Sequence, residues 1–365
     1  MFDSDKIYGM FWGLAIGDAL GAPLEYSNKP KWSGLIGMDN ITNQSLSLGQ
    51  VTDDTELTIS LLDSIITYNN SIINSEKKKI SYPLYYDEIY SFNNYSEWTN
   101  SNPPEISHQF QYLFETENRF DLFEKENEIN NIKYKWNKYK LKYNNYYEDD
   151  MINWSTDNSC LIRASPLVFC NIKDALTDCK LTHKHPICED GVSLYIQILK
   201  NCLTTNVYDN YDKNLTTALV PDDIKNKEKT RKETSLYCST EELKRLIRHI
   251  LKRNERRLDV HKSDILTTLY CGLNCYAFFD KFETAMNWVI GYHLDQNLGL
   301  GDCDSNASIC GAIMGAKIGF RAMLQEYKTN FNYNIVSTIT TERPHHYQPS
   351  KRLNYLINNL IHLIN

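Results

Sequence analysis

Near its start the chain reads GMFWGLAIGDALG over residues 9–21, with a glycine at every fourth position. Residues four apart lie on one face of an α-helix, so this spacing predicts a helix with a stripe along one side that has no side chains. Near the end of the chain, Ala307-Gly311-Gly315-Gly319 repeats the spacing. Glycine inside a helix costs about 1 kcal/mol relative to alanine, so the stripes predict two helices whose backbones approach closely at the centre of a bundle. A membrane-dimerisation face is the alternative, but Asp18 and Lys317 interrupt the two runs with charge.

The rest of the chain is also predicted to be helical. It shows no strand–helix alternation of the kind that builds a doubly wound sheet. The absence of glycine between Gly49 and Gly191 argues against a hairpin-rich β fold in that stretch. We therefore expect an all-α fold in which residues 1–365 form a single domain, with helical or irregular insertions at about 70–150 and 207–236. Further helices are expected at about 54–68, 158–172, 188–205, 240–256, 262–280, 281–294 and 350–363.

Composition narrows the class of protein. The chain has 365 residues, and its 39 basic and 46 acidic side chains give a net charge of −7, which argues against nucleic acid as the main partner. The first residues lack the positive start of a secretory signal, and Asp18 breaks the apolar run that follows, which argues against a membrane span. The ten cysteines contain no Cys-x-x-Cys pair, as expected of reduced, mostly buried thiols. We expect a cytoplasmic, monomeric protein.

Two acidic clusters point to the chemistry: Thr52-Asp53-Asp54-Thr55 and Asp302-Cys303-Asp304-Ser305, each followed by an apolar helical run. Carboxylates this close repel one another unless a cation lies among them, and oxygen ligands suit a hard divalent ion such as Mg²⁺. If the fold joins the clusters, their four carboxylates carry enough charge for two magnesium ions. Taken alone, each cluster also fits helix capping, with Thr52 or Ser305 as the N-cap and Glu56 in a capping pair.

Three further segments accompany the clusters. Residues 17–25, GDALGAPLE, end the first predicted helix, and residues 158–163, NSCLIR, and 182–186, THKHP, lie between the clusters. Together with GQVTDDTE (49–56) and GDCDSNA (301–307), they resemble the ADP-ribosylglycohydrolase family, which includes the ADP-ribosyl-arginine hydrolases and the dinitrogenase reductase-activating glycohydrolases. The resemblance runs through most of the chain and leaves the two predicted insertions uncovered. It implies a single orthogonal helical bundle of the ADP-ribosylglycohydrolase type, with metal ions in a central cleft.

The resemblance also implies roles for particular residues. Two Mg²⁺ ions, or Mn²⁺ in their place, would be held by Thr52, Asp53, Asp54, Asp302, Asp304 and Ser305. The catalytic residues would be Glu25 and Asp304, and we assign proton transfer to Glu25. The substrate-binding residues would be Asn158, Ser159, Cys160, Leu161, Arg163 and His183.

Two of these residues have simpler interpretations. Arg163 lies in an apolar run, so a buried ion pair is an alternative to a ligand contact and is the favoured one. The spacing of His183 and His185 suggests a pair of zinc ligands, but the sequence offers no third or fourth ligand at a suitable spacing.

The function implied is a magnesium-dependent hydrolase that cleaves the glycosidic bond between ADP-ribose and a modified protein side chain. Arginine is the first choice of side chain. Ser305 stands in place of the family's threonine, keeps its hydroxyl group and occurs in the arginine-specific branch of the family. Serine-linked and small-molecule conjugates of ADP-ribose remain alternatives. A non-catalytic ADP-ribose-binding relative is the alternative from another class, against which the retained carboxylates argue.

Overall fold

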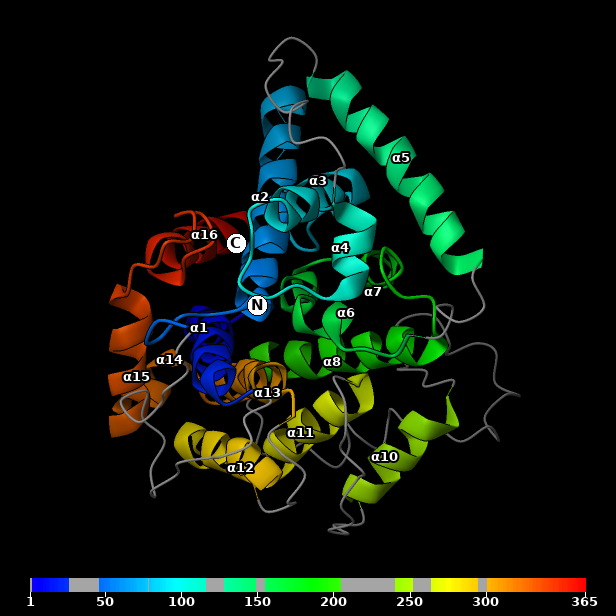
Figure 1. Cartoon of the computed structure of the whole chain (residues 1–365). Coiled ribbons are helices and arrows are strands. Elements are labelled where there is room, and N and C mark those ends of the chain that lie inside the picture. The colour runs from blue at the N-terminus through cyan, green and yellow to red at the C-terminus, as the bar shows by residue number, and fades with distance from the viewer. Residues whose placement is uncertain are drawn as a thin grey trace, which may run out of the picture.

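The computed structural model of the chain describes residues 2–25, 46–77, 79–115, 128–148, 155–204, 240–251, 264–294 and 301–365. Within these ranges the regular structure is helical (Figure 1), apart from an isolated antiparallel bridge between Asp157 and Asp264. The all-α prediction is confirmed. The helices are α1 (Ser4–Gly21), α2 (Asp53–Glu76), α3 (Glu88–Thr99), α4 (His108–Phe114), α5 (Glu128–Glu148), α6 (Ser159–Ile162), α7 (Ile172–Cys179), α8 (Pro186–Thr204), α10 (Glu241–Leu251), α11 (Ile265–Phe278), α12 (Phe282–Leu294), α13 (Cys303–Ile318), α14 (Phe320–Gln325), α15 (Tyr327–Thr338) and α16 (Pro349–Ile364), with 3-10 turns η1 (Ala22–Leu24) and η4 (Ser165–Phe169).

The two glycine-striped helices, α1 and α13, pack against each other at the centre of the molecule (Figure 1). A Cβ atom built on Gly9 would lie 2.2 Å from the carbonyl oxygen of Gly315, and one on Gly13 would lie 2.2 Å from that of Gly311. At the other end of the pair, a Cβ atom on Gly17 would lie 2.1 Å from the carbonyl oxygen of Ala307. Because the numbers rise on one helix as they fall on the other, the helices are antiparallel and their backbones touch.

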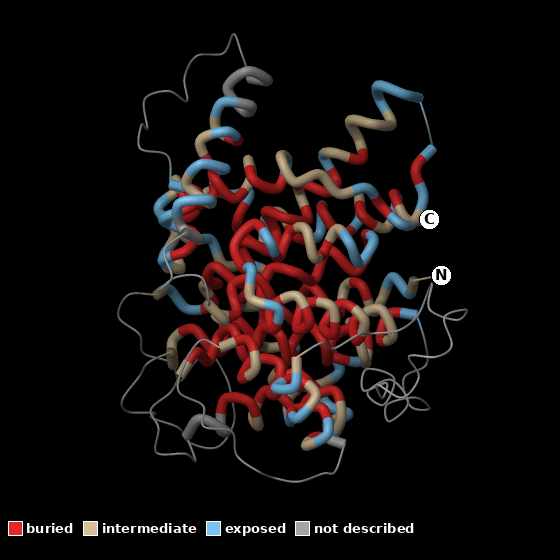
Figure 2. The backbone as a smooth tube through the Cα atoms, turned by 90° about the vertical axis from the view of Figure 1, so that its right-hand side faces the viewer, coloured by how far each residue is buried: buried red, intermediate tan, exposed pale blue. Residues whose placement is uncertain are grey.

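The remaining helices enclose this pair, and the buried part of the chain is concentrated in the middle of the bundle (Figure 2). The segment Ser4–Leu24 is long and apolar enough to cross a membrane, yet 83% of its apolar window is buried inside the protein. Its burial against α13 shows that its apolar character serves the core of the bundle.

The expected helix over 158–172 is wrong. The segment forms the short helix α6, the 3-10 turn η4 and then the start of α7. Pro166 lies in the first turn of η4, and a proline at this position cannot supply the backbone hydrogen bond that would continue α6. The other expected helices are present within a few residues, except that α2 runs on to Glu76 and the last residues expected of α10 lie outside the described part of the chain.

The segment predicted as an insertion at about 70–150 contributes to the core. It supplies α3, α4 and α5, and α5 lies along the outside of the other two (Figure 1). Rings of Phe92, Phe114, Trp136 and Tyr139 form one aromatic cluster that joins the three helices. The second predicted insertion, at about 207–236, lies outside the described residues.

Candidate active site

The antiparallel register of α1 and α13 brings three chain segments to one place. A Cβ atom on Gly21, the last residue of α1, would lie 2.5 Å from the Cα atom of Asp304 in the first turn of α13. The start of α2 joins them there, since the hydroxyl of Thr52 lies 3.4 Å from Oδ2 of Asp304. The two acidic clusters of the sequence therefore meet, together with the residues that follow α1.

Asp18 of α1 holds the start of α2 in place. Its carboxylate accepts hydrogen bonds from the backbone N–H groups of Thr52 and Thr55, at 3.1 Å each, and from their hydroxyls at 2.9 and 2.5 Å. These donors include backbone N–H groups that a helix start leaves unsatisfied. Burial raises the pKa of Asp18 to about 6, and its hydrogen bonds with the two threonines oppose that rise.

The capping interpretation of the clusters is wrong in its details. Thr52 occupies the N-cap position of α2, but its side chain caps nothing, and Asp18 satisfies the first turn instead. Glu56 is bonded to Arg343 and Trp98 rather than to the helix start. Helix α13 begins at Cys303, before Ser305, so that serine lies inside the helix. Both clusters are thus free to direct oxygen atoms into the site.

The side-chain oxygens of the two clusters interleave. The hydroxyl of Ser305 lies 3.4 Å from Oδ2 of Asp54, and the hydroxyl of Ser308 donates to Oδ1 of Asp54 at 2.7 Å. The side-chain amide of Asn158 donates to Oδ2 of Asp302 at 2.7 Å and so helps to position that carboxylate. One oxygen each from Asp18, Asp54 and Asp304 lies within 4.8 Å of the other two, and the same holds for Glu25, Asp302 and Asp304.

The charge of this site fits a hard divalent cation. Burial and neighbouring carboxylates raise the pKa values of Asp53, Asp54 and Asp304 well above their usual range. Among the described residues no lysine or arginine forms an ion pair with them. The ligands on offer are carboxylate and hydroxyl oxygens, which suit Mg²⁺ or Mn²⁺. A cation here would remove the repulsion that otherwise forces these groups to hold protons.

Glu25 lies at the edge of the site and has an acidic partner that the sequence did not indicate. Burial raises its pKa to about 10, with further contributions from Glu105, Asp302 and Asp53 and from a hydrogen bond to Glu105. Glu105 comes from the connection between α3 and α4, inside the segment predicted as an insertion. Both side chains are only partly buried, so this is where the acidic site reaches solvent.

The residues predicted to bind substrate divide into two groups. Asn158 faces the acidic site through Asp302, and Ser159, Cys160 and Leu161 follow it as buried residues of α6. Arg163 and His183 lie in a layer of buried side chains behind α6. Both are fully buried, and their polar atoms are directed at protein groups.

Arg163 joins four elements of that layer. Its guanidinium group forms a 2.9 Å ion pair with Asp178 of α7 and donates to the carbonyl oxygen of Ser159 at 2.6 Å. It also lies over the rings of Tyr95 and Phe110, 5.2 Å from each ring centre. These are the contacts of the buried ion-pair partner that the sequence favoured.

Sequence reasoning missed two residues of the site. Asp18 had a signal, since it is a charged residue on a helix that is otherwise apolar and buried. Glu105 had none, because it follows two prolines in a loop, and only the packing of α3 and α4 carries it to Glu25.

Comparison with known proteins supports the fold and gives the family of the chain. A solved structure described as an ADP-ribosylglycohydrolase-related protein complex matches 91% of this chain and 97% of its own, with a TM-score of 0.55 and 19% identity, which supports the fold. A search of curated proteins gave no match. The family model described as ADP-ribosylglycohydrolase matches residues 2–347. The chain belongs to the ADP-ribosylglycohydrolase family.

Proposed function

We propose that the protein is a magnesium-dependent hydrolase that releases ADP-ribose from a modified arginine side chain of a protein. Family membership supports hydrolysis of ADP-ribose conjugates as a class. The observation that carries the proposal is the meeting of Asp54, Asp302 and Asp304 with Glu25 in one site, where the hydroxyls of Thr52 and Ser305 add further oxygen ligands.

Thr52, Asp53, Asp54, Asp302, Asp304 and Ser305 are the residues that we propose to hold two Mg²⁺ ions, with Mn²⁺ as the alternative metal. A divalent cation at these oxygens supplies positive charge that orients and polarises hydroxyl groups. Asp18 and Asn158 act on the ligands rather than on the substrate: Asp18 positions Thr52 at the start of α2, and Asn158 positions the carboxylate of Asp302. Residues of this kind tune metal affinity through the ligands that they hold.

Glu25 is the residue that we propose for proton transfer, with Asp304 assisting. Cleavage of a glycosidic bond needs a proton for the leaving group or a base for the attacking water. A carboxyl group with a pKa near 10 in the metal-free protein carries a proton at neutral pH. Its position at the solvent-facing edge of the acidic site, beside Glu105, gives that proton a route to a bound conjugate.

We further propose a cytoplasmic monomer that acts on ADP-ribosylated proteins, without nucleic acid or membrane as a main partner. The net charge of −7 supports this, as does the burial of the apolar helix α1. Serine-linked or small-molecule conjugates of ADP-ribose are the alternative substrates, and a non-catalytic ADP-ribose binder is the alternative function.

A release assay tests these points together. Arginine- and serine-ADP-ribosylated proteins are incubated with the protein in Mg²⁺ or in EDTA, and free ADP-ribose is measured. We expect Mg²⁺-dependent release from the arginine substrate, falling to background in Asp302→Ala and Asp304→Ala. Asp280→Ala is the matched control, because that aspartate is exposed and lies in the turn between α11 and α12.

The other outcomes are equally informative. Release of ADP-ribose from the serine substrate alone would show that the enzyme acts on the serine linkage and not on the arginine linkage. Binding of ADP-ribose without release from any substrate would favour the non-catalytic alternative. Release that persists in EDTA and in both substituted proteins would overturn the metal assignment.

A further inference from the structure

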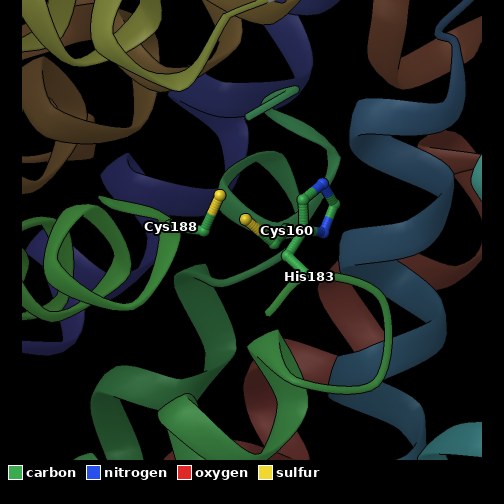
Figure 3. Close-up of side chains that lie close together, drawn as sticks. All are labelled: Cys160, His183 and Cys188. Carbon is green, nitrogen blue, oxygen red and sulfur yellow. The ribbon is translucent and has the colours of Figure 1, made fainter. Parts of the chain in front are cut away.

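A second group of metal-binding side chains lies behind the segment that carries Asn158. Cys160 from α6, His183 from the loop after α7 and Cys188 from α8 converge there (Figure 3). One ligand atom from each lies within 4.8 Å of the other two, and all three residues are buried. The thiol of Cys179 is hydrogen-bonded to that of Cys160, so the surroundings are rich in sulfur.

Both ring nitrogens of the buried His183 lie beside oxygen atoms. Its Nδ1 atom lies 2.7 Å from the hydroxyl of Thr182. Its Nε2 atom lies 3.1 Å from Oδ1 of Asp157, an ion-pair contact that lowers the pKa of Asp157 and that a metal ion on Nε2 would replace. Histidines that bind metals commonly hold an oxygen with the other ring nitrogen in this way.

The distances between the ligand atoms of Cys160, His183 and Cys188 are close to those in a tetrahedral metal site. Zinc–sulfur and zinc–nitrogen bonds of about 2.3 and 2.0 Å place neighbouring ligand atoms roughly 3.5–4 Å apart. The ligand atoms of this cluster, at no more than 4.8 Å from one another, need to approach by at most about 1.3 Å. The sequence concealed the site, because Cys160 and Cys188 stand 28 positions apart on either side of His183 and match no zinc spacing.

We propose that Cys160, His183 and Cys188 form a binding site for a thiophilic divalent cation of the Zn²⁺ type, separate from the acidic site. Binding forms two metal–sulfur bonds and one metal–nitrogen bond and releases the two thiol protons to solvent. Thiolate and imidazole ligands select Zn²⁺ over Mg²⁺, whereas the acidic site offers only oxygen.

Such a cation would connect three elements behind the active site. It would tie α6 to α8 and to the loop before it, and α6 directly follows Asn158, which holds Asp302. The cation would therefore stabilise the protein and hold the segment at the back of the site. The competing interpretation is a metal-free arrangement, in which an imidazolium of His183 pairs with Asp157 and the thiols stay protonated.

Cobalt is the probe that separates the two, because Co²⁺ bound to thiolates absorbs through sulfur-to-metal charge transfer and Co²⁺ bound to oxygen does not. The full chain, stripped of metal under reducing conditions, is titrated with Co²⁺ in excess Mg²⁺, which fills the oxygen-rich site. We expect one equivalent of Co²⁺ to produce the charge-transfer absorption and Zn²⁺ to abolish it. In Cys160→Ser and Cys188→Ser the absorption should be lost, or should need at least tenfold more Co²⁺.

Two further proteins serve as controls. Cys275→Ser removes a buried thiol of a different group, beside Cys310, and should keep the absorption. Asp302→Ala should also keep it, so a failure of the proposed function can be told from a failure of this site. Circular dichroism checks that each variant is folded.

A wild-type protein without the charge-transfer absorption would overturn the proposal, whatever the variants do. So would an absorption that survives in folded Cys160→Ser and Cys188→Ser proteins, or one that only Cys275→Ser abolishes.

Discussion

At the residue scale, the acidic site is a set of buried carboxylates whose pKa values are set by one another. Asp18 is held by threonines of α2, and Glu25 shares a hydrogen bond with Glu105. Neither arrangement follows from the residue types alone. Both leave a carboxyl group with a raised pKa in a site that has no basic neighbour among the described side chains to offset it.

Replacing Glu25 with glutamine tests its assignment to proton transfer. Glutamine mimics the protonated acid but needs no proton from solvent on folding, so Glu25→Gln should raise the free energy of unfolding of the metal-free protein at neutral pH. The rate of ADP-ribose release should fall by roughly 10²- to 10⁴-fold, as when a general acid or base is lost. Calorimetric Mg²⁺ binding is the control and should be retained. A rate within a few-fold of wild type would remove Glu25 from the mechanism.

The carboxylates also predict how metal-free stability depends on pH. The pKa of Asp18 is raised from 3.8 to about 6 and that of Glu25 from 4.5 to about 10. The folded state keeps protons that the unfolded chain has lost, so the free energy of unfolding falls as pH rises above about 4. The contribution of Asp18 is lost by about pH 7, while that of Glu25 continues to fall beyond it. Melting temperatures in EDTA should therefore decrease from about pH 5 to pH 8.

Saturating Mg²⁺ should flatten this decrease, because a cation stabilises the ionised carboxylates. Melting curves in Mg²⁺ and in EDTA at each pH make the comparison. Equal slopes under the two conditions would show that no cation binds at these groups.

At the element scale, α1 and α13 are paired by glycines where any side chain would collide with backbone. Gly13→Ala places a Cβ atom 2.2 Å from the carbonyl oxygen of Gly311. Overpacking costs roughly 1–3 kcal/mol, and we expect the upper end because a carbonyl of a central helix cannot turn aside. The shift would also move the start of α13 away from α1. Urea unfolding measures the loss of stability, and Mg²⁺ titration should show weaker binding.

Gly191→Ala is the matched control for this substitution. Gly191 also lies inside a helix, but its added Cβ atom would meet only the ends of the Ile265 and Leu269 side chains, at 2.9 Å. Those side chains can adjust, and alanine gains up to about 1 kcal/mol in helix propensity, so the net change should be small. Equal losses in the two proteins would contradict the backbone-contact explanation.

At the scale of the whole molecule, a buried ion pair connects the start of α2 to the C-terminal part of the chain. Arg343 forms two bonds to Glu56 of α2, at 2.9 and 2.7 Å, and donates to the carbonyl oxygens of Ser101 and Asn102. The latter two residues begin the loop that delivers Glu105. One guanidinium group thus joins α2, the α3–α4 loop and the segment before α16.

Arg343→Met should cost about 3–5 kcal/mol in the free energy of unfolding, because it leaves Glu56 buried without its partner. Arg352→Met is the comparison. Arg352 pairs with Asp63, but both are partly exposed, so its loss should cost at most about 1 kcal/mol. Urea unfolding in saturating Mg²⁺ measures both. A similar cost for the two substitutions would mean that the Glu56 pair contributes no more than a surface pair.

Features that depend on local pattern could be predicted from the sequence. The glycine spacing of residues 9–21 predicted a close helix pair, which α1 and α13 form. This prediction succeeds because helix periodicity is a property of a short segment. The meeting of the two acidic clusters was implied by the family resemblance, and local pattern gave it only as a condition. The expected helix at 158–172 failed where a local signal, Pro166, was given too little weight.

By itself the sequence determined a helical chain, carboxylate and hydroxyl groups at the starts of α2 and α13, and the small-residue stripes that bring α1 and α13 together. The tertiary structure decided which distant groups become neighbours. It set Asp18 at the start of α2, Glu105 beside Glu25, and Cys160 with Cys188 around His183. No local pattern encodes these pairings, because each depends on how whole helices pack and on the register in which α1 meets α13.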